Sequence, residues 1–303
     1  MTGPARAISA ATRRSATARL SVALAAVGAI ALTACGSDDK KSSSGAASSK
    51  PASLTITAST FGAKGAEYAI PAGVKSGVVT VTLRNTTKFP REAQLLRVEG
   101  KHSTAEVKRV VDSDDAPVPS WMHAAGGVAD VPPKASKKAT VELAPGNYLV
   151  IDTSDPDSPF IPAKFGHFEV AAGDSQAKFP TAPAQITARE YAFAASNLKA
   201  GTSEVLFRNT GKEVHHAILF PMNAGATIAD VTKFFKTDGK AGGPPPVDFK
   251  KGVGTITALD GGSEQVVELT LKSGRYAAVC FFTDRAGGPP HFLKGQLTEL
   301  TVE

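Results

Sequence analysis

The chain has 303 residues, of which 42% are hydrophobic and 20% charged, a composition that fits a folded protein and excludes global disorder. Its formal net charge is +6, but residues 1–34 hold four arginines and no acid. The rest of the chain therefore has 30 basic and 28 acidic residues, and a net charge of +2 does not indicate a nucleic-acid-binding surface. The two cysteines exclude a disulfide framework and a four-cysteine zinc site, and the 28 glycines and 20 prolines favour short strands joined by turns.

The first 34 residues have the pattern of an export signal. Four arginines precede Leu20–Ala34, an uncharged stretch that is shorter than the roughly 20 residues of a membrane-spanning helix. The segment Leu32-Thr33-Ala34-Cys35-Gly36 resembles the lipobox of bacterial lipoproteins, in which the cysteine is lipid-modified and becomes the first mature residue. This resemblance implies a lipid anchor on Cys35 and a place at the cell membrane, on its extracytoplasmic side. The alternative is an ordinary secretory signal in which Cys35 is incidental.

The segment after the signal has no residues from which to build a core. Residues 35–51 are rich in serine, alanine, lysine and aspartate, which is typical of a flexible tether.

The rest of the chain contains one unit twice, with a period of about 125 residues that fits a duplicated domain. Val78–Asn85 matches Ser203–Asn209 near the start of each unit, and Gly146-Asn147-Tyr148 matches Gly274-Arg275-Tyr276 near the end. The sequence therefore predicts two domains, residues 52–172 and residues 184–303.

Each unit alternates apolar and polar residues over short runs bounded by turn residues, the pattern of half-buried strands. Each unit also holds one capping-box start of a helix, Ser103 with Glu106 and Thr227 with Asp230. We predict an all-β fold of two tandem Greek-key β-sandwich domains, each with one short helix.

Side chains that bind metals gather only in the second unit. His215 and His216 open one strand, Cys280 ends another, His291 follows eleven residues later and Gln296 five residues after that. A thiolate and two imidazoles with a weak axial ligand form the type 1 copper site, whose soft thiolate favours copper. Because neighbouring residues of a strand point to opposite faces, only one of His215 and His216 is expected to enter the site, and His215 is favoured. Cys280 also has the alternative of an inert buried thiol.

At these residues the sequence resembles the cupredoxin family, over most of residues 184–303. The first histidine ligand of that family lies six residues after an asparagine, as His215 does after Asn209, and the axial residue lies five after the second histidine. The resemblance implies copper bound by His215, Cys280 and His291. Gln296 takes the place of the usual axial methionine, as in the stellacyanins.

The first unit lacks these ligands. Arg91 stands where His215 stands and Asp152 where Cys280 stands, so this domain is expected to hold no copper.

Together these patterns predict a membrane-anchored, extracytoplasmic electron-transfer lipoprotein that passes electrons to or from a redox protein partner. A single type 1 centre holds one electron and has no open coordination position, so we expect a carrier and not an enzyme. The alternatives are a metal-free β-sandwich lipoprotein that serves as a binding or cell-envelope scaffold, and a carrier of Cu(I).

Overall fold

The computed structural model describes residues 50–61, 65–113, 117–154, 166–240, 242–249 and 252–303. The predicted signal segment and Cys35 lie outside these residues, as does most of the predicted tether. None of the helices in the described part of the chain has the length and hydropathy needed to cross a bilayer.

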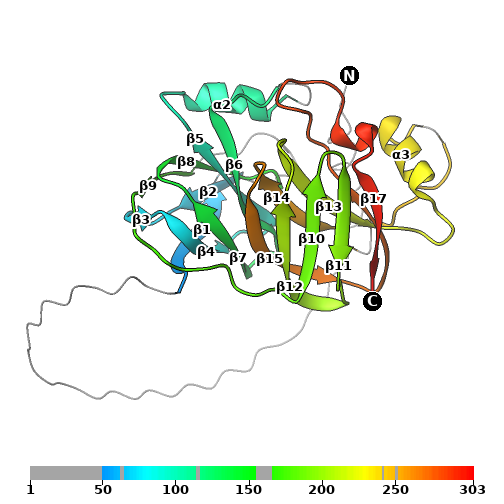
Figure 1. The fold of residues 1–303 in the computed structure, drawn as a ribbon, viewed down its shortest axis with the longest axis horizontal. Coiled ribbons are helices and arrows are strands. Elements are labelled where there is room, and N and C mark those ends of the chain that lie inside the picture. Colours follow the sequence, from blue (N-terminus) through cyan, green and yellow to red (C-terminus); the bar gives the residue numbers. More distant parts are fainter. Residues whose placement is uncertain (1–49, 62–64, 114–116, 155–165, 241, 250–251) are drawn as a thin grey trace, which may run out of the picture.

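The described chain forms two mixed β-sheets (Figure 1), which confirms the all-β prediction. The eight strands of the first sheet are, in spatial order, β11 (Ala192–Ser196), β10 (Ala184–Arg189), β12 (Gly201–Asn209), β15 (Glu264–Leu271), β7 (Ser136–Leu143), β4 (Gly77–Asn85), β1 (Ala52–Phe61) and β2 (Gly65–Ala69). The nine strands of the second sheet are β17 (Leu297–Val302), β16 (Gly274–Val279), β13 (His215–Pro221), β14 (Gly254–Leu259), β6 (Met122–Val131), β5 (Arg91–Val98), β8 (Gly146–Ile151), β9 (Gly166–Ala171) and β3 (Val74–Lys75).

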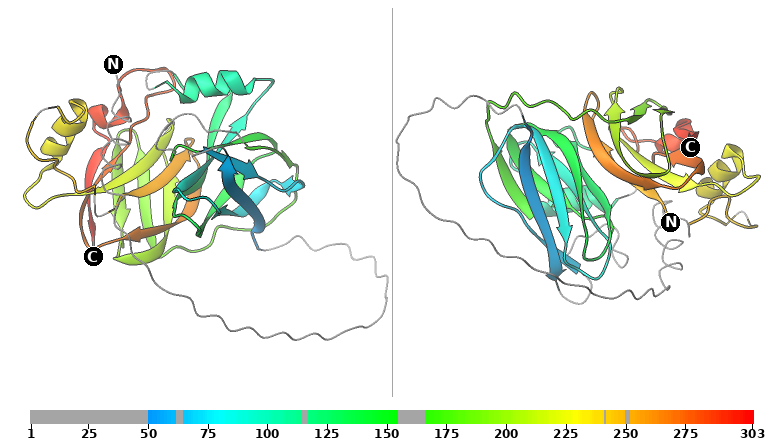
Figure 2. Two further views of the ribbon diagram at one scale, coloured as in Figure 1. Left: turned by 180° about the vertical axis from the view of Figure 1, so that it is seen from behind. Right: turned by 90° about the horizontal axis from the view of Figure 1, so that it is seen from below.

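The first half of the chain (strands β1 to β9) and the second half (strands β10 to β17) contribute to both sheets, and their strand orders mirror each other across the boundary. In the first sheet the order β11-β10-β12-β15 of the second half meets β7-β4-β1-β2 of the first half, and β17-β16-β13-β14 meets β6-β5-β8-β9 in the second sheet. Figure 2 shows the blue-to-green first half beside the second half, which ends in orange and red. The same strand order in both halves is the structural counterpart of the repeat in the sequence.

Both sheets therefore continue across the boundary between the halves. Strand β15 pairs with β7 over three residue pairs, from Gln265 and Val141 to Val267 and Ala139, whereas β14 and β6 share the single pair Leu259 and Ala125. Tandem domains joined only by a linker would each keep separate sheets. Here the backbone hydrogen bonds of one half extend the ladders of the other.

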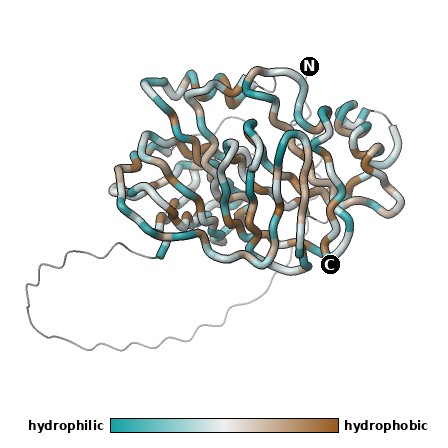
Figure 3. The backbone as a smooth tube through the Cα atoms, viewed as in Figure 1, coloured by the Kyte–Doolittle hydropathy of each residue, from teal (hydrophilic) through white to brown (hydrophobic). Residues whose placement is uncertain are grey.

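The core lies between the sheets. Strands such as β4 and β12 place every second residue inside, for example Val79, Val81 and Leu83 on β4 and Val205 and Phe207 on β12, all less than 2% exposed. The alternation of hydrophobic and hydrophilic residues along the strands can be followed in Figure 3. This period of two is the pattern from which the strands were predicted.

Among the described residues, each half carries one α-helix, α2 (Thr104–Val111) and α3 (Ile228–Lys236). Both predicted capping boxes are confirmed: Ser103 and Thr227 are the N-caps, each bonded reciprocally with the acidic residue three positions on. Helix α3 covers a satellite core in which Phe235 packs against Phe220 and Phe292. A short 3-10 helix, η2 (His291–Lys294), is an element that the sequence did not predict.

Candidate metal centre

Three neighbouring elements of the second half bring His215, Cys280 and His291 together. His215 is the first residue of β13, and Cys280 directly follows β16. Because β13 and β16 pair antiparallel, the start of one strand lies beside the end of the other. His291 opens η2 and is held there by backbone hydrogen bonds, from its own N–H to Phe282 and from the N–H of Phe292 to Cys280.

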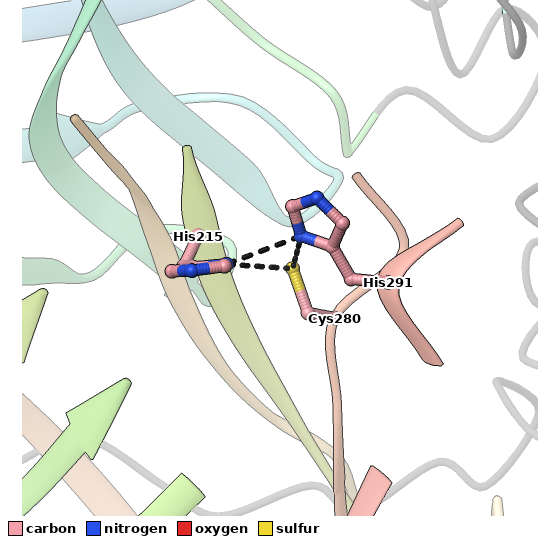
Figure 4. Close-up of side chains that lie close together, drawn as sticks. All are labelled: His215, Cys280 and His291. Carbon is pink, nitrogen blue, oxygen red and sulfur yellow. Dashed lines mark hydrogen bonds between the residues drawn. The ribbon is translucent and has the colours of Figure 1, made fainter. Parts of the chain in front are cut away.

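The donor atoms of these three residues converge on one point (Figure 4). The two Nδ1 atoms are 3.1 Å apart, and the Cys280 Sγ lies 3.9 Å from Nδ1 of His215 and 3.6 Å from Nδ1 of His291. All three residues are 0% exposed. A point equidistant from the three atoms lies about 2.1 Å from each of them, close to the length of a metal–imidazole bond.

Burial keeps these groups in their uncharged forms when no metal is bound. Desolvation, aided by the neighbouring His291, lowers the pKa of His215 to about 4, and desolvation also lowers the pKa of His291. Desolvation raises the pKa of the Cys280 thiol to about 12. Two neutral imidazoles with their Nδ1 atoms facing a sulfur are ready-made ligands, and a bound cation would compensate the buried thiolate.

The outer nitrogen of His291 is held by a carboxylate. Its Nε2 lies 3.0 Å from Oδ1 of Asp284, and the same oxygen accepts a hydrogen bond of 2.9 Å from the Tyr191 hydroxyl. The other carboxylate oxygen, Oδ2, forms an ion pair with Lys294. Burial raises the pKa of Asp284, but hydrogen bonds from Lys294 and Tyr191 outweigh it, so the pKa is lowered and the group is ionised at neutral pH. An ionised carboxylate only accepts hydrogen bonds, so the proton of His291 lies on Nε2 and the Nδ1 lone pair faces the site.

Gln296 lies at the same place with one free oxygen. Its side chain is 0% exposed, and its Nε2 donates to the carbonyl of Arg189 at 3.2 Å. Its Oε1 has no hydrogen-bond partner among the described residues, and the backbone of Gln296 bonds to both neighbouring residues of the site, from its N–H to the carbonyl of His291 and from the N–H of Cys280 to its own carbonyl. A buried amide oxygen without a partner costs about 1–3 kcal/mol, which a ligand to that oxygen would offset.

The other histidine of the pair has a different contact. His216 Nε2 accepts a hydrogen bond of 2.9 Å from the N–H of Phe281, and burial lowers the pKa of its ring to about 3. The structure therefore groups His215, the residue favoured by spacing, with Cys280 and His291, and uses His216 to hold the backbone beside Cys280.

The equivalent place in the first half is occupied by an ion pair. Arg91 Nη1 lies 3.2 Å from Oδ2 of Asp152, and the two side chains are only 1% and 2% exposed. Within the described ranges, His215, Cys280 and His291 form the only group of three histidine, cysteine or acidic side chains with converging donor atoms.

Sequence reasoning assigned no role to three residues of the site, Asp284, Tyr191 and Lys294. Asp284 had a signal in principle, since it lies inside the segment between Cys280 and His291. Tyr191 had none, because it lies 93 residues from Asp284 along the chain.

Several solved structures to which the chain is similar are copper proteins. No protein-family model matches the chain, and no curated protein does. Among solved structures the chain is similar to auracyanin B (24% identity, 39% of this chain and 86% of that chain, TM-score 0.27). It is also similar to auracyanin A, a "blue" copper protein of Chloroflexus aurantiacus (21%, 39% and 96%, TM-score 0.26), and to copper nitrite reductase of Nitrosomonas europaea (15%, 84% and 94%, TM-score 0.24).

Proposed function

We propose that the second half of the chain binds one copper ion in a type 1 centre and carries single electrons, in the manner of a cupredoxin. The observation that carries the proposal is the buried triangle formed by the Cys280 sulfur and the Nδ1 atoms of His215 and His291. A thiolate with two imidazoles suits copper, whereas calcium and magnesium prefer oxygen ligands. Gln296 would be a fourth, weaker ligand through its Oε1. Copper bound there would supply a one-electron couple between Cu(II) and Cu(I).

The same burial supports electron transfer over catalysis. All four proposed ligands are 0% exposed, so the protein side chains leave little room for a substrate beside the donor atoms. The backbone bonds at η2 and the Asp284 hydrogen bond fix the orientation of His291, which would limit movement of this ligand between oxidation states. We therefore propose a carrier that exchanges electrons with a protein partner.

Titration of the purified full chain with Cu(II) tests this function. We expect one copper per chain and an intense visible band from the cysteine thiolate, and Cys280→Ser should abolish the band. A chain that takes up no copper and keeps a reactive thiol would favour the metal-free scaffold instead. Tight binding of Cu(I) without a band after oxidation would favour the copper-carrier alternative.

We further propose that the protein is lipid-anchored through Cys35 on the extracytoplasmic side of the cell membrane. The support is the segment Leu32-Thr33-Ala34-Cys35-Gly36 after an apolar stretch. Lipid chains supply the anchoring, so Cys35→Ser should move the protein from the membrane fraction to the soluble fraction or stall its processing. Fractionation of cells measures this, and a Cys35→Ser variant that remains wholly with the membrane lipid would contradict the anchor.

A further inference from the structure

The segment 281–290, which links Cys280 to His291, contacts the first half of the chain in two ways: Phe282 packs against the apolar cluster that contains Leu96 and Met122, and the described hydrogen bonds all come from one side chain, Arg285. Arg285 lies in the middle of this segment and reaches the residues that precede and begin β6. Its Nη1 donates to the carbonyl oxygens of Pro119 at 2.9 Å, Met122 at 3.1 Å and Val118 at 3.5 Å. These acceptors are separated from Arg285 by more than 160 residues of chain.

A second residue of the second half completes this contact. Arg285 Nη2 donates to Oδ1 of Asp260 at 2.8 Å. Asp260 in turn accepts the backbone N–H of Ala124 at 2.9 Å and lies 2.8 Å from Nδ1 of His123, both on β6. The guanidinium of Arg285 thus donates to a carbonyl at the start of β6, and the carboxylate of Asp260 accepts from an N–H of the same strand. A lysine ammonium lacks the planar set of donors that makes both contacts of Arg285 at once.

The same segment also contacts His291 itself and a residue close to His215 in the chain. The N–H of Arg285 donates to Oε2 of Glu213 at 2.6 Å, two residues before His215, and the neighbouring Asp284 binds Nε2 of His291. Any displacement of Arg285 therefore acts on the surroundings of both imidazoles. No strand or α-helix runs through residues 281–290, so the segment has no ladder of its own to hold it.

We infer that the first half of the chain supports the metal-ligand segment of the second half, and that Arg285 is the positioning residue through which it does so. The first half, which lacks the proposed copper ligands, would then help to position those of the second half. The importance of the support for copper rests on the proposed function, whereas the support itself is a property of the metal-free protein. The segment is held by hydrogen bonds to the start of β6, to Glu213 and to His291. These contacts keep Cys280 and His291 at the spacing that a preorganised site requires.

The test compares Arg285→Met with Arg275→Met in the full chain. Arg275 is a matched control because its described contacts, with Glu299 and the carbonyl of Ala226, all lie within the second half. In the metal-free protein, amide hydrogen exchange in residues 281–290 should become roughly tenfold faster in Arg285→Met, whereas exchange in β13 and β16 should match the control. In the copper-loaded protein, release of copper to a chelator should be about tenfold faster in Arg285→Met than in the control.

Rescue separates positioning from general destabilisation. Arg285→Lys keeps the charge but not the planar set of donors, so its exchange and release rates should lie between those of the wild type and Arg285→Met; it is also the variant to use if Arg285→Met does not fold. Exchange in residues 281–290 equal to that of the control, in either variant, would overturn the inference. If the wild type binds no copper, the proposed function fails, and the exchange measurement still decides the role of Arg285.

Discussion

At the scale of single residues, the candidate centre is a group of buried polar atoms that have few hydrogen-bond partners. Nδ1 of His215 and of His291 have only each other and the Cys280 sulfur as near polar neighbours in the contacts described, and Gln296 Oε1 has no partner there. Buried polar atoms usually have hydrogen bonds, and among the described residues Gln296 Oε1 and Nε2 of His215 have none. The Arg91–Asp152 pair of the first half shows the opposite case, in which two buried charges satisfy each other.

The position of Gln296 gives the first prediction. A glutamine oxygen is a harder donor than a thioether, so it favours Cu(II), and Gln296→Met should raise the reduction potential by on the order of 100 mV. Voltammetry of both proteins in one buffer measures the change. Gln185→Met, at a half-buried position on β10, is the control. An unchanged or lower potential in Gln296→Met would show that Gln296 is not the axial ligand.

A buried glutamate of the first half gives a prediction about pH. Desolvation, with the nearby charges of Asp130 and Asp152, raises the pKa of Glu92 from 4.5 to about 8. Between these two values the unfolded chain loses this proton and the folded chain keeps it, so stability falls as the pH rises through this window. Below the window the group is protonated in both states and has no effect.

The neutral isostere should remove this dependence. At pH 7, Glu92→Gln should be more stable than the wild type by about 3 kcal/mol, and the two proteins should be equally stable at pH 4. Urea unfolding at several pH values measures the difference, with the exposed Glu142→Gln as control. Parallel pH profiles of Glu92→Gln and the wild type would contradict the assignment.

At the scale of elements, the centre depends on how β13, β16 and η2 meet. Backbone hydrogen bonds join them at the proposed ligands, for example from the N–H of Cys280 to the carbonyl of Gln296 at 3.2 Å and from the N–H of Gln296 to the carbonyl of His291 at 2.9 Å. Behind η2, Phe292 packs against Phe235 of α3 and against Phe281. Helix α3 therefore supports the back of η2, which carries His291.

The helix caps can be tested separately. Thr227→Ala removes the side chain that accepts from the N–H of Asp230, and Ser103→Ala does the same at the start of α2. Each change should lower the free energy of unfolding by about 1 kcal/mol, because it leaves backbone donors of the first turn without a partner. Denaturant unfolding measures the loss. Asn or Asp at the same positions should restore most of it, and failure of both to do so would mean that these caps do not hold the helices.

At the scale of the whole molecule, the two halves share both sheets and two buried glutamines at their boundary. Gln94 Oε1 accepts from the N–H of Ala258 at 2.6 Å, and its Nε2 donates to the carbonyls of Gly126 at 3.1 Å and of Ala258 at 3.2 Å. From the other half, Gln265 Oε1 accepts from the N–H of Gly127 at 3.1 Å. These side-chain hydrogen bonds join the two halves where β14 and β6 share only one residue pair.

We therefore expect the chain to unfold as one cooperative unit. Calorimetry should show a single transition, since separation of the halves would leave the edges of β14 and β15 without partners. Gln94→Leu should lower the stability of that one transition by about 1–3 kcal/mol, because the polar groups of Ala258 lose their partner in a buried place. Two well-separated transitions in the wild type would show that the halves are independent.

The local sequence was sufficient for the strands, the two helix starts and the chemical types of the candidate ligands. Alternation along Val79–Leu83 depends on a period of two residues, and the caps at Ser103 and Thr227 depend on a residue three positions away, so both can be recognised within a short window. The order of His215, Cys280 and His291 along the chain likewise predicted a set of donors.

Only the tertiary structure decided which histidine faces the sulfur, that Asp284 and Tyr191 surround His291, and that the sheets of the two halves are continuous. Each of these depends on groups far apart in the sequence, such as His215 and Cys280 at 65 residues, or Gln94 and Ala258 at 164 residues. Such contacts form because burial and hydrogen-bond satisfaction are optimised over the whole molecule, and no local pattern of residues encodes them.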